Sequence, residues 1–414
     1  MTIAVQKYGG TSVATPEMIR RVARIVRHTH RAGRPTVVVV SARGDTTDEL
    51  IRQALELNPA PSARESDQLL ATGENQSAAL LAMALHEIGV PAVSLTGPQA
   101  GILADGRHGA GVIAAIDTSR VLRQLADGNV VVVSGFQGMD THGDIITLGR
   151  GGSDTTAVAL AAALTAASCE IYTDVDGVYT ADPRIVPGAR VLSHVDAGVM
   201  TEMAFAGAQV LHSRAVELAA VHGMDLQVRS SYTQSAGTTI LGRSCQQVME
   251  SQGFVTAVTH DREVVWAQVR ATRSAPGLAT VVFDALAQKS VPVDLVSWSG
   301  PGESEPRLGF ALHRRDLPVA QHLLAQLAAD LGCVTELDEQ VGKLSLVGTG
   351  LLNRPEYTVR MLLALSAAGI TPSWGATTQL RSSVIIPVDR LTEAVTTLHR
   401  EFELDRDDAE SMPA

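Results

Sequence analysis

The sequence predicts an α/β protein, with a large N-terminal part built on a mainly parallel sheet and two smaller modules after it. Val- and Ile-rich runs alternate with helical patterns along residues 1–235, and such runs are typical of strands buried on both faces of a parallel sheet. Residues 264–298 and 342–375 repeat one order of elements: strand, Pro-containing turn, helix, strand. At 414 residues the chain is also too long for one ordinary domain.

The predicted elements follow from local signals. Strands are expected at residues 2–8, 36–41, 91–97, 129–136 and 169–175. The first helix should begin after Thr15, an N-cap residue, with Pro16 at its first position. Further helices are expected at 48–57, 74–89 and 155–166. Residues 233–253 are small and polar, which predicts a connector before the repeated modules.

Composition excludes several classes of function. The net charge is −11 and the chain has no block of Lys or Arg, which argues against nucleic acid or an anionic membrane as the main partner. Cys169, Cys245 and Cys333 are too widely spaced for a disulfide framework or a metal cage. The first residues lack an apolar signal core, and no run approaches the ~20 residues that span a bilayer. We therefore expect a cytoplasmic protein.

The stretch TLGRGGSDTTAVALAAAL, residues 147–164, places charged and small residues directly before an apolar helix. Gly151 and Gly152 allow a sharp turn and close approach of another molecule. Ser153 or Asp154 could cap the helix, whose N-terminus attracts anions. Arg150 offers a fixed fork for carboxylate or phosphate. The alternative is a capped helix after a glycine turn.

Three further turns follow predicted strands or open helices. In KYGGTSV (7–13) the glycines and Lys7 could receive a phosphate, or form an ordinary strand–helix turn; no Walker A motif is present. SARGDTTDEL (41–50) is rich in hydroxyls and carboxylates, which could equally be an N-cap cluster. Glu74, expected at the start of a helix, either complements the helix end or pairs with a substrate ammonium.

An irregular segment, residues 172–192, follows a predicted buried strand. Its hydroxyl and charged groups are either an ordinary surface loop or a site for a base, a ribose and phosphates. By contrast LVGTGLLN (346–353) lacks the third glycine of a dinucleotide fingerprint, and we interpret it as a tight turn. The histidines at 28, 30, 212 and 222 lack metal-ligand spacing, and we interpret them as structural or surface residues.

Together with LHSRAVELA (211–219) and VRSSY (228–232), these motifs occur in the order found in aspartate kinases, and the chain resembles that family over essentially its whole length. The resemblance is very specific over residues 1–240. It implies a three-layer amino-acid kinase domain with a mainly parallel central sheet, followed by two ACT-like βαββαβ regulatory modules. The implied ranges are 1–240 for the kinase domain, 241–254 for a linker, 255–337 and 338–406 for the two modules, and 407–414 for an acidic tail.

The resemblance implies MgATP-dependent phosphorylation of the β-carboxylate of L-aspartate, the entry step to Lys, Thr, Met and Ile biosynthesis. The chemistry agrees, because a carboxylate of pKa ~3.9 is already ionised at neutral pH and needs no general base. Catalysis then requires positioning and charge neutralisation. Lys7 and Asp154 are the implied catalytic residues, with Asp154 orienting Lys7 or Mg²⁺; no set of metal-ligating side chains is predicted.

The resemblance also implies the binding residues. Aspartate would be held by Ser41, Asp45, Thr46, Thr47, Glu74, Arg150, Gly151, Gly152 and Ser153. ATP would be held by Lys7, Tyr8, Gly9, Gly10, Thr173, Asp174, Tyr179, Asp182, Arg184 and Gln209. Gln209 stands where relatives carry Lys in a Gly-Ala-Lys-Val-Leu run, so the phosphate site has one cation fewer.

Regulation and assembly are implied with departures from the family pattern. The effector positions carry Ser274, Trp298, Ser299 and Glu356, where the family has an acid, an amide pair and a glycine, so weakened control by Lys and Thr is expected. The modules would form a homodimer or higher oligomer, and Met249 lies where an internal start could give a separate regulatory subunit. The alternatives are a non-catalytic amino-acid sensor and a sister kinase acting on another acid.

Overall fold

The computed structural model describes residues 2–242, 254–271, 277–289, 291–298 and 307–406. Its described residues form two compact units. Unit 1 comprises Met1–Val178, Val191–Ala204 and Gln209–Val248, and unit 2 comprises Tyr179–Arg190, Phe205–Ala208 and Met249–Ala414. The predicted kinase range, 1–240, therefore contains two segments that belong to unit 2. Within the described residues, no helix is both long and apolar enough to cross a membrane.

Unit 1 is built on an eight-stranded sheet with the order β10-β12-β11-β9-β1-β2-β6-β3. The predicted strands are β1 (Ala4–Tyr8), β2 (Thr36–Val40), β3 (Ala92–Leu95), β6 (Val130–Ser134) and β9 (Ser168–Thr173), and they run parallel to one another. Beyond β9 the sheet continues with β11 (Leu226–Ser230), β12 (Thr238–Leu241) and β10 (His194–Asp196), of which β11 and β12 pair antiparallel. The prediction of a mainly parallel sheet is confirmed.

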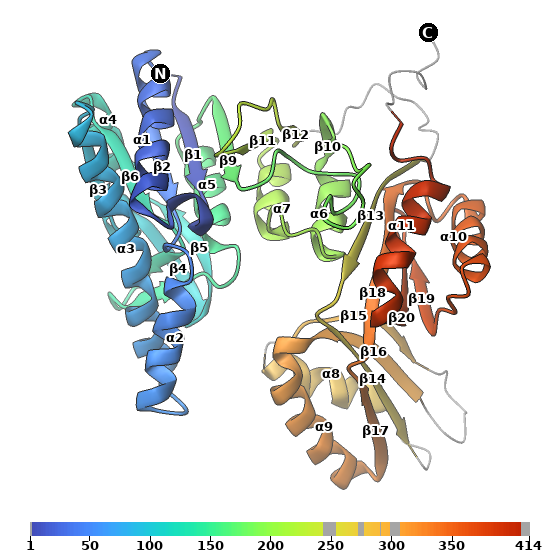
Figure 1. The fold of residues 1–414 in the computed structure, drawn as a ribbon. Coiled ribbons are helices and arrows are strands. Elements are labelled where there is room, and N and C mark those ends of the chain that lie inside the picture. The colour runs from blue at the N-terminus through green and yellow to red at the C-terminus, as the bar shows by residue number, and fades with distance from the viewer. Residues whose placement is uncertain (1, 243–253, 272–276, 290, 299–306, 407–414) are drawn as a thin grey trace. The chain divides into compact units, whose positions relative to one another are not determined.

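Helices cover both faces of this sheet, which gives three layers (Figure 1). On one face α1 (Pro16–Arg31) and α3 (Ala63–Glu87) enclose an apolar core with alternate valines of β2 and β6. On the other, α5 (Gly152–Ala163) contacts β1, β2 and β9 and packs beside α7 (Ser213–Val221). The remaining α-helices between residues 2 and 242 are α2 (Thr46–Leu57), α4 (Ser119–Ala126) and α6 (Ala197–Phe205). Burial on both faces explains why the strand sequences are continuously apolar.

Two predicted helix starts are wrong and one is confirmed. Thr15 caps α1 as expected, since its hydroxyl accepts from Met18 N. Helix α5 begins at Gly152 after the left-handed Gly151, so Ser153 and Asp154 lie in its first turn and cap nothing. Helix α3 begins at Ala63, capped by Ser62, so Glu74 lies in mid-helix. Gly73 lies within α3, where it allows close packing. A Cβ on this residue would lie 2.9 Å from the Cβ of Ala42.

A small four-stranded sheet, β5-β4-β7-β8, was not predicted. Its strands are β4 (Ile102–Arg107), β5 (Ala110–Ile116), β7 (Gln137–Met139) and β8 (Ile145–Thr147). Strands of three residues carry too little of an apolar pattern to be recognised in a sequence. The sheet matters because β8 ends directly before the glycine-rich turn at 148–152.

Unit 2 contains two four-stranded antiparallel sheets. The first combines β14 (Val264–Ala271), β15 (Val293–Trp298), β16 (Arg307–His313) and β17 (Cys333–Asp338) with α8 (Leu278–Gln288) and α9 (Leu317–Leu331). The second combines β13 (Phe254–Asp261), β18 (Val341–Thr349), β19 (Trp374–Thr377) and β20 (Arg381–Pro387) with α10 (Pro355–Ala367) and α11 (Leu391–Glu401). The predicted repeat appears as β14-α8-β15 and β18-α10-β19. LVGTGLLN ends β18 and turns at Gly350, as expected.

Strand β13 lies in the range predicted for the first module, but it pairs with β18 of the second sheet. It covers an edge of β18 that would otherwise expose unpaired amides and carbonyls. The described chain also has four short 3₁₀ helices: η1 (Gly10–Val13), η2 (Pro98–Ala100), η3 (Arg314–Asp316) and η4 (Val388–Arg390).

The segment 179–190 packs on the second sheet of unit 2. Ala181 and Val186 belong to the same core as Val258 and Leu344. Apolar packing therefore places the loop that carries Tyr179, Asp182 and Arg184 in unit 2, although the sequence predicts it as part of the kinase domain.

Candidate active site

The carboxyl ends of β1, β2 and β9 bring several predicted site residues together in unit 1. Tyr8, the last residue of β1, is in register with Val40 of β2 and Tyr172 of β9. The loops that follow approach closely, because Gly44 N donates to Gly10 O at 3.1 Å. A Cβ at Gly10 would lie 2.7 Å from the carbonyl oxygen of Ala42. Only glycine fits at this position.

Lys7 and Asp154 form an ion pair at this edge of the sheet, with Nζ 2.5 Å from Oδ1. Their side chains are 12% and 11% exposed. Lys7 comes from β1 and Asp154 from the first turn of α5, and Asp154 Oδ2 also accepts from His212 N at 3.4 Å. The two residues predicted to be catalytic are thus adjacent, and the carboxylate fixes the direction of the ammonium.

The turn between β8 and α5 depends on left-handed glycines. Gly149 has φ +73° and Gly151 has φ +69°, and Gly152 N donates to Gly149 O at 3.0 Å. A Cβ at Gly151 would lie 2.1 Å from the ring of His212. Arg150 stands exposed at the tip of this turn and forms no ion pair with any residue in the described ranges. Its guanidinium is therefore available to an anionic ligand.

The N-terminus of α5 is aimed at the same edge of the sheet. Ser153 is 8% exposed, and a Cβ at Gly135, just after β6, would lie 2.9 Å from the Cβ of Ser153. This close approach brings the first turn of α5 against the end of β6. The unpaired amides and partial positive charge of a helix N-terminus suit a phosphate or carboxylate.

Glu74 is a buried carboxyl with an incomplete set of partners. Its side chain is 3% exposed, and Oε1 accepts from Ala42 N at 2.9 Å. Oε2 is buried without a hydrogen-bond partner among the described residues. Burial raises the pKa of Glu74 to about 7. A buried oxygen without a donor is costly in the folded state and fits a cationic ligand group.

The loop after β2 carries the other residues predicted to bind the substrate. Ser41 N donates to Tyr8 O at 3.2 Å, which fixes the start of the loop. Helix α2 begins at Thr46 with Asp45 at the N-cap, yet Asp45 forms no capping hydrogen bond. Thr46 and Thr47 are half-buried and Asp45 is exposed. The polar groups of this loop therefore do not serve as a side-chain cap.

Tyr8, predicted at the nucleotide site, presents its side chain to the core. Its side chain is fully buried in the apolar core and stacks on Tyr172 with ring centroids 4.7 Å apart. Burial raises the pKa of its hydroxyl well above the usual value. A strand residue alternates between faces, and this one points into the α1–α3 layer. Gly9 and Gly10, directly after it, do lie at the strand end.

The remaining nucleotide candidates are divided between the units. Thr173 ends β9 and donates to Asp174 at 3.1 Å, and Gln209 is exposed in unit 1. Asp182 accepts from Arg184 at 2.8 Å within unit 2, the unit that also contains Tyr179. Gly9 and Gly10 follow β1 directly, and a Cβ at Gly9 would lie 3.7 Å from Lys7 Nζ.

Among the described residues, no group of three or more His, Cys, Asp or Glu side chains is arranged to hold a metal ion. Mg²⁺ in nucleotide sites commonly uses one or two carboxylates together with the phosphates. Asp154 is the carboxylate positioned for this role, although Lys7 already neutralises it. The residues present therefore fit a magnesium ion that arrives with a nucleotide.

Of the predicted effector residues, two can be described. Trp298 ends β15 and is 63% exposed. Glu356 lies exposed in the first turn of α10, with its carboxylate 3.9 Å from Arg354. Ser274, Ser299 and Met249 lie outside the described residues, as do most of the predicted linker and the acidic tail.

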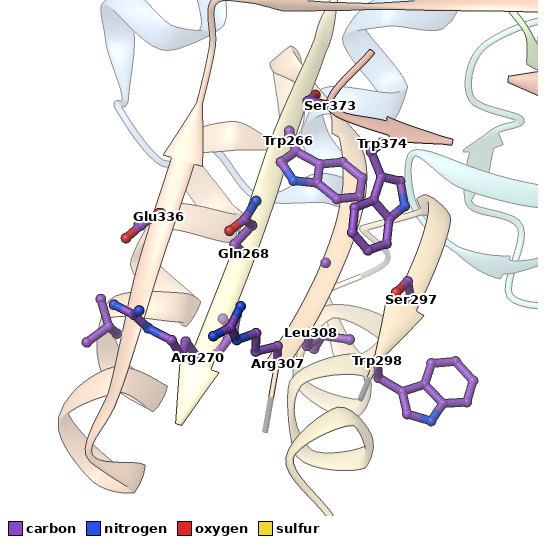
Figure 2. Close-up of a pocket in the computed structure, with 13 residues that line it drawn as sticks. Trp266, Gln268, Arg270, Ser297, Trp298, Arg307, Leu308, Glu336, Ser373 and Trp374 are labelled. Carbon is purple, nitrogen blue, oxygen red and sulfur yellow. The ribbon is translucent and has the colours of Figure 1, made fainter. Parts of the chain in front are cut away.

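A pocket of about 750 Å³ lies on the open face of the first sheet of unit 2 (Figure 2). Trp266 and Trp374 meet in it with ring centroids 5.1 Å apart, while Trp298 lies apart from them. Arg270 and Arg307 stand directly opposite each other on β14 and β16. No residue predicted to bind aspartate or ATP lines this pocket.

The sequence did not identify four residues that shape the site of unit 1: Asp67, Gly135, His212 and Arg214. LHSRAVELA was recognised as a motif, but no role was derived for His212 or Arg214. Asp67 lies outside the helix predicted at 74–89, so its place on the same helix face as Glu74 became apparent only in the structure.

The comparisons with known proteins agree with this geometry. Residues 2–230 match the model of the amino acid kinase family. The aspartokinase of Mycolicibacterium smegmatis is 44% identical over 412 residues, which covers 99% of this chain and 98% of that protein. The aspartokinase of Thermus thermophilus is 42% identical over 408 residues, covering 98% and 100%.

Solved structures give the same result over the whole chain. E. coli aspartokinase III in complex with aspartate and ADP superposes with a TM-score of 0.81 at 26% identity, covering 96% of this chain and 99% of that one. Aspartate kinase from Synechocystis gives a TM-score of 0.76 at 27% identity, with both chains fully covered. The chain therefore belongs to the aspartokinases, within the amino acid kinase family.

Proposed function

We propose that the chain transfers the γ-phosphoryl group of MgATP to the β-carboxylate of L-aspartate, the first step of aspartate-family amino-acid biosynthesis. The observation that carries the proposal is the buried Glu74 oxygen without a donor, on a carboxyl that contacts the loop after β2. E. coli aspartokinase III, a solved relative, is described as a complex with aspartate and ADP. A free α-amino acid supplies the ammonium and carboxylates that Glu74 and Arg150 would pair with.

In this proposal the protein supplies position and charge rather than a base. The attacking carboxylate is ionised at neutral pH. Lys7, held by Asp154 at 2.5 Å, and the α5 N-terminus would stabilise the phosphoryl oxygens as charge develops. Magnesium bound with ATP would neutralise part of the phosphate charge.

Aspartate would be fixed through its ammonium and its α-carboxylate, which leaves the β-carboxylate free to attack. Glu74 would ionise on meeting the ammonium, and Arg150 would hold a carboxylate through two parallel N–H bonds. The amides of Gly151 and Gly152 and the hydroxyls of Ser41, Thr46, Thr47 and Ser153 would complete the site, with Asp45 at its rim.

For ATP we propose Gly9 and Gly10 at the phosphates, with Thr173 and Asp174 after β9 and with Gln209. Tyr179, Asp182 and Arg184 stay predictions that rest on the sequence motif. We further propose that the regulatory modules join copies of this chain into a homodimer or a larger oligomer. A separately made regulatory subunit starting at Met249 stays a prediction too.

A non-catalytic amino-acid sensor is the alternative from another class. The intact Lys7–Asp154 pair favours an enzyme, because a sensor needs no cation held at a phosphoryl position.

The test is an ATP-dependent hydroxamate assay with aspartate, glutamate and N-acetylglutamate. We expect turnover of aspartate above the other two acids. Arg150→Ala should raise KM for aspartate about tenfold to a hundredfold, because a charge-assisted bidentate contact is lost. The matched control is Arg120→Ala, an exposed arginine on α4. Turnover of another acid, or of none, would overturn the proposal.

A further inference from the structure

We propose that Asp67 and Arg214 are positioning residues, which act through the turn 148–152 to hold Arg150 at a set distance from Glu74. The inference rests on the proposed function, since it deepens the role given there to Arg150 and Glu74. Neither Asp67 nor Arg214 was singled out as a site residue by the sequence.

Asp67 is almost completely buried on α3, with 1% of its surface exposed. Its carboxylate accepts from Thr147 Oγ1 at 2.5 Å, from Thr147 N at 3.1 Å and from Gly109 N at 3.0 Å. His108 Nδ1 lies 2.8 Å from the same group. A buried charge is tolerated when its oxygens are fully hydrogen-bonded, as they are here. Asp67 thereby joins the end of β8 to the β4–β5 hairpin.

Arg214 joins the same two segments from another helix. It lies on α7, and its guanidinium donates to Leu148 O at 2.5 Å and to Gly111 O at 3.0 Å. Leu148 follows Thr147 directly, and Gly111 is two residues beyond Gly109. An anion on α3 and a cation on α7 therefore hold neighbouring backbone groups of one strand end and one hairpin.

The turn that carries Arg150 starts at these contacts. Leu148 N donates to Phe136 O at 2.8 Å, so both sides of this residue are held. The segments also touch directly, since a Cβ at Gly149 would lie 2.9 Å from Gly109 O. Only Gly149 separates the held residue from Arg150. The direction in which Arg150 leaves the backbone is thus set by groups outside the substrate site.

Helix α3 connects the contacts of Asp67 to the proposed substrate site. Asp67 and Glu74 are seven residues apart, two helical turns, and so lie on one face of the helix. One rigid element therefore anchors the turn of Arg150 and also presents the carboxyl proposed to meet the ammonium. Glu74 and Arg150 would hold the ammonium and the α-carboxylate, which lie on the same carbon in aspartate and in glutamate, so their spacing sets where that carbon lies relative to the transferring phosphoryl group. The longer side chain of glutamate would then carry its carboxylate past that group.

The experiment measures this spacing through substrate choice. Thr147→Val removes the hydroxyl that donates to Asp67 and keeps the shape, whereas Thr147→Ser keeps the hydroxyl. We expect Thr147→Val and Arg214→Met each to raise KM for aspartate about tenfold or more, as small misplacements of binding groups do. As KM for aspartate rises, the preference for aspartate over glutamate, measured as the ratio of kcat/KM values, should fall. Thr147→Ser and Arg214→Lys should retain part or all of both.

The controls separate positioning from stability. Asp105→Asn, at an exposed position on β4 of the same hairpin, should change neither quantity, and thermal unfolding is measured for every variant. Variants of unchanged Tm that keep the KM for aspartate and the preference over glutamate would overturn the inference. So would a loss of activity that only follows a loss of folded protein. A parent chain without aspartate turnover would instead overturn the proposed function.

Discussion

The ammonium of Lys7 lies 2.5 Å from Oδ1 of Asp154, which joins the end of β1 to the first turn of α5. Lys7→Ala and Asp154→Ala should each reduce kcat more than a hundredfold. Losing a charge aimed at the transferring group removes about 3–4 kcal/mol of stabilisation that is present mainly in the transition state.

Both variants are assayed at saturating aspartate and ATP, with circular dichroism to establish folding. Lys289→Ala, at an exposed position after α8, serves as the matched control. A folded Lys7 or Asp154 variant that retains more than about a tenth of the parental rate would contradict the assigned roles.

Glu74 should make aspartate binding depend on pH. Burial raises its pKa to about 7, so the carboxyl is largely neutral below that pH and ionised above it. An ammonium binds the ionised form better, and KM for aspartate should fall as the pH rises from 6 to 8. Glu74→Gln should have a higher KM at pH 8 and lose this dependence. An equally steep profile in Glu74→Gln would assign the titration to another group.

The same group should affect stability in the opposite sense. An unfolded glutamate ionises near 4.5, whereas native Glu74 keeps its proton to about pH 7. Its contribution is therefore fully present below pH 4.5 and is lost as the pH rises through 7, by about 3 kcal/mol. Without substrate at pH 8, Glu74→Gln should unfold at a higher temperature than the parent. A lower Tm at that pH would contradict the burial argument.

The strands and side chains of unit 1 show what the sequence could predict and what it could not. Valine runs identified β2 and β6 because strands buried on both faces have no polar alternation. Lys7 and Asp154 were found from motifs, yet the start of α5 was misplaced because Gly151 adopts a left-handed conformation and leaves no side chain to cap. Asp67 was missed because its importance lies in tertiary contacts with short strands. The burial of the Tyr8 side chain was not foreseen, because a strand residue next to a site can still face the core.

Gln209 gives a prediction for the nucleotide. It is exposed in unit 1 and can donate a hydrogen bond, but it brings no charge. Gln209→Lys should lower KM for ATP by a factor that corresponds to roughly 1–2 kcal/mol, the difference between a charged and a neutral contact. The aspartate KM should not change. An unchanged or higher KM for ATP would mean that this position does not face a phosphate.

Asp294 should be essential to unit 2. Its carboxylate lies 3.0 Å from Lys343 Nζ and accepts two bonds of 2.9 Å from Arg381, which links β15 of one sheet to β18 and β20 of the other. Burial by itself would raise the pKa of Asp294. The hydrogen bonds from Arg381 and the charge of Lys343 outweigh it and hold the pKa well below its usual range. Lys343 also donates to Phe205 O at 2.9 Å.

Asp294→Asn would remove the carboxylate charge that the nearly buried side chains of Lys343 and Arg381 share. We expect a loss of about 3–5 kcal/mol in the free energy of unfolding of unit 2, measured by urea denaturation. Asp284→Asn, at an exposed position on α8, is the matched control and should cost little. Equal costs for both variants would show that the triad contributes nothing specific.

The last prediction concerns control by end products: the enzyme should respond poorly to lysine and threonine. The family resemblance implies that an effector needs an acid for its ammonium and close backbone and amide donors for its carboxylate. Trp298 at the end of β15 is 63% exposed and supplies no amide. Glu356 stands where a glycine would let the backbone approach, and its carboxylate lies 3.9 Å from Arg354. Ser274 and Ser299 replace further polar groups in the sequence.

Each buried polar group of an effector left without a partner costs about 1–3 kcal/mol, so two or three such losses move affinity beyond physiological concentrations. Initial rates are measured against lysine and threonine, singly and together, up to about 10 mM. Inhibition at that concentration corresponds to a binding free energy of only about 3 kcal/mol. We expect little inhibition in the parent and increased sensitivity when Ser274→Asp, Trp298→Gln, Ser299→Asn and Glu356→Gly are combined. Strong inhibition of the parent at sub-millimolar effector would show that these substitutions leave a working pocket, because the missing contacts would then be supplied by other groups.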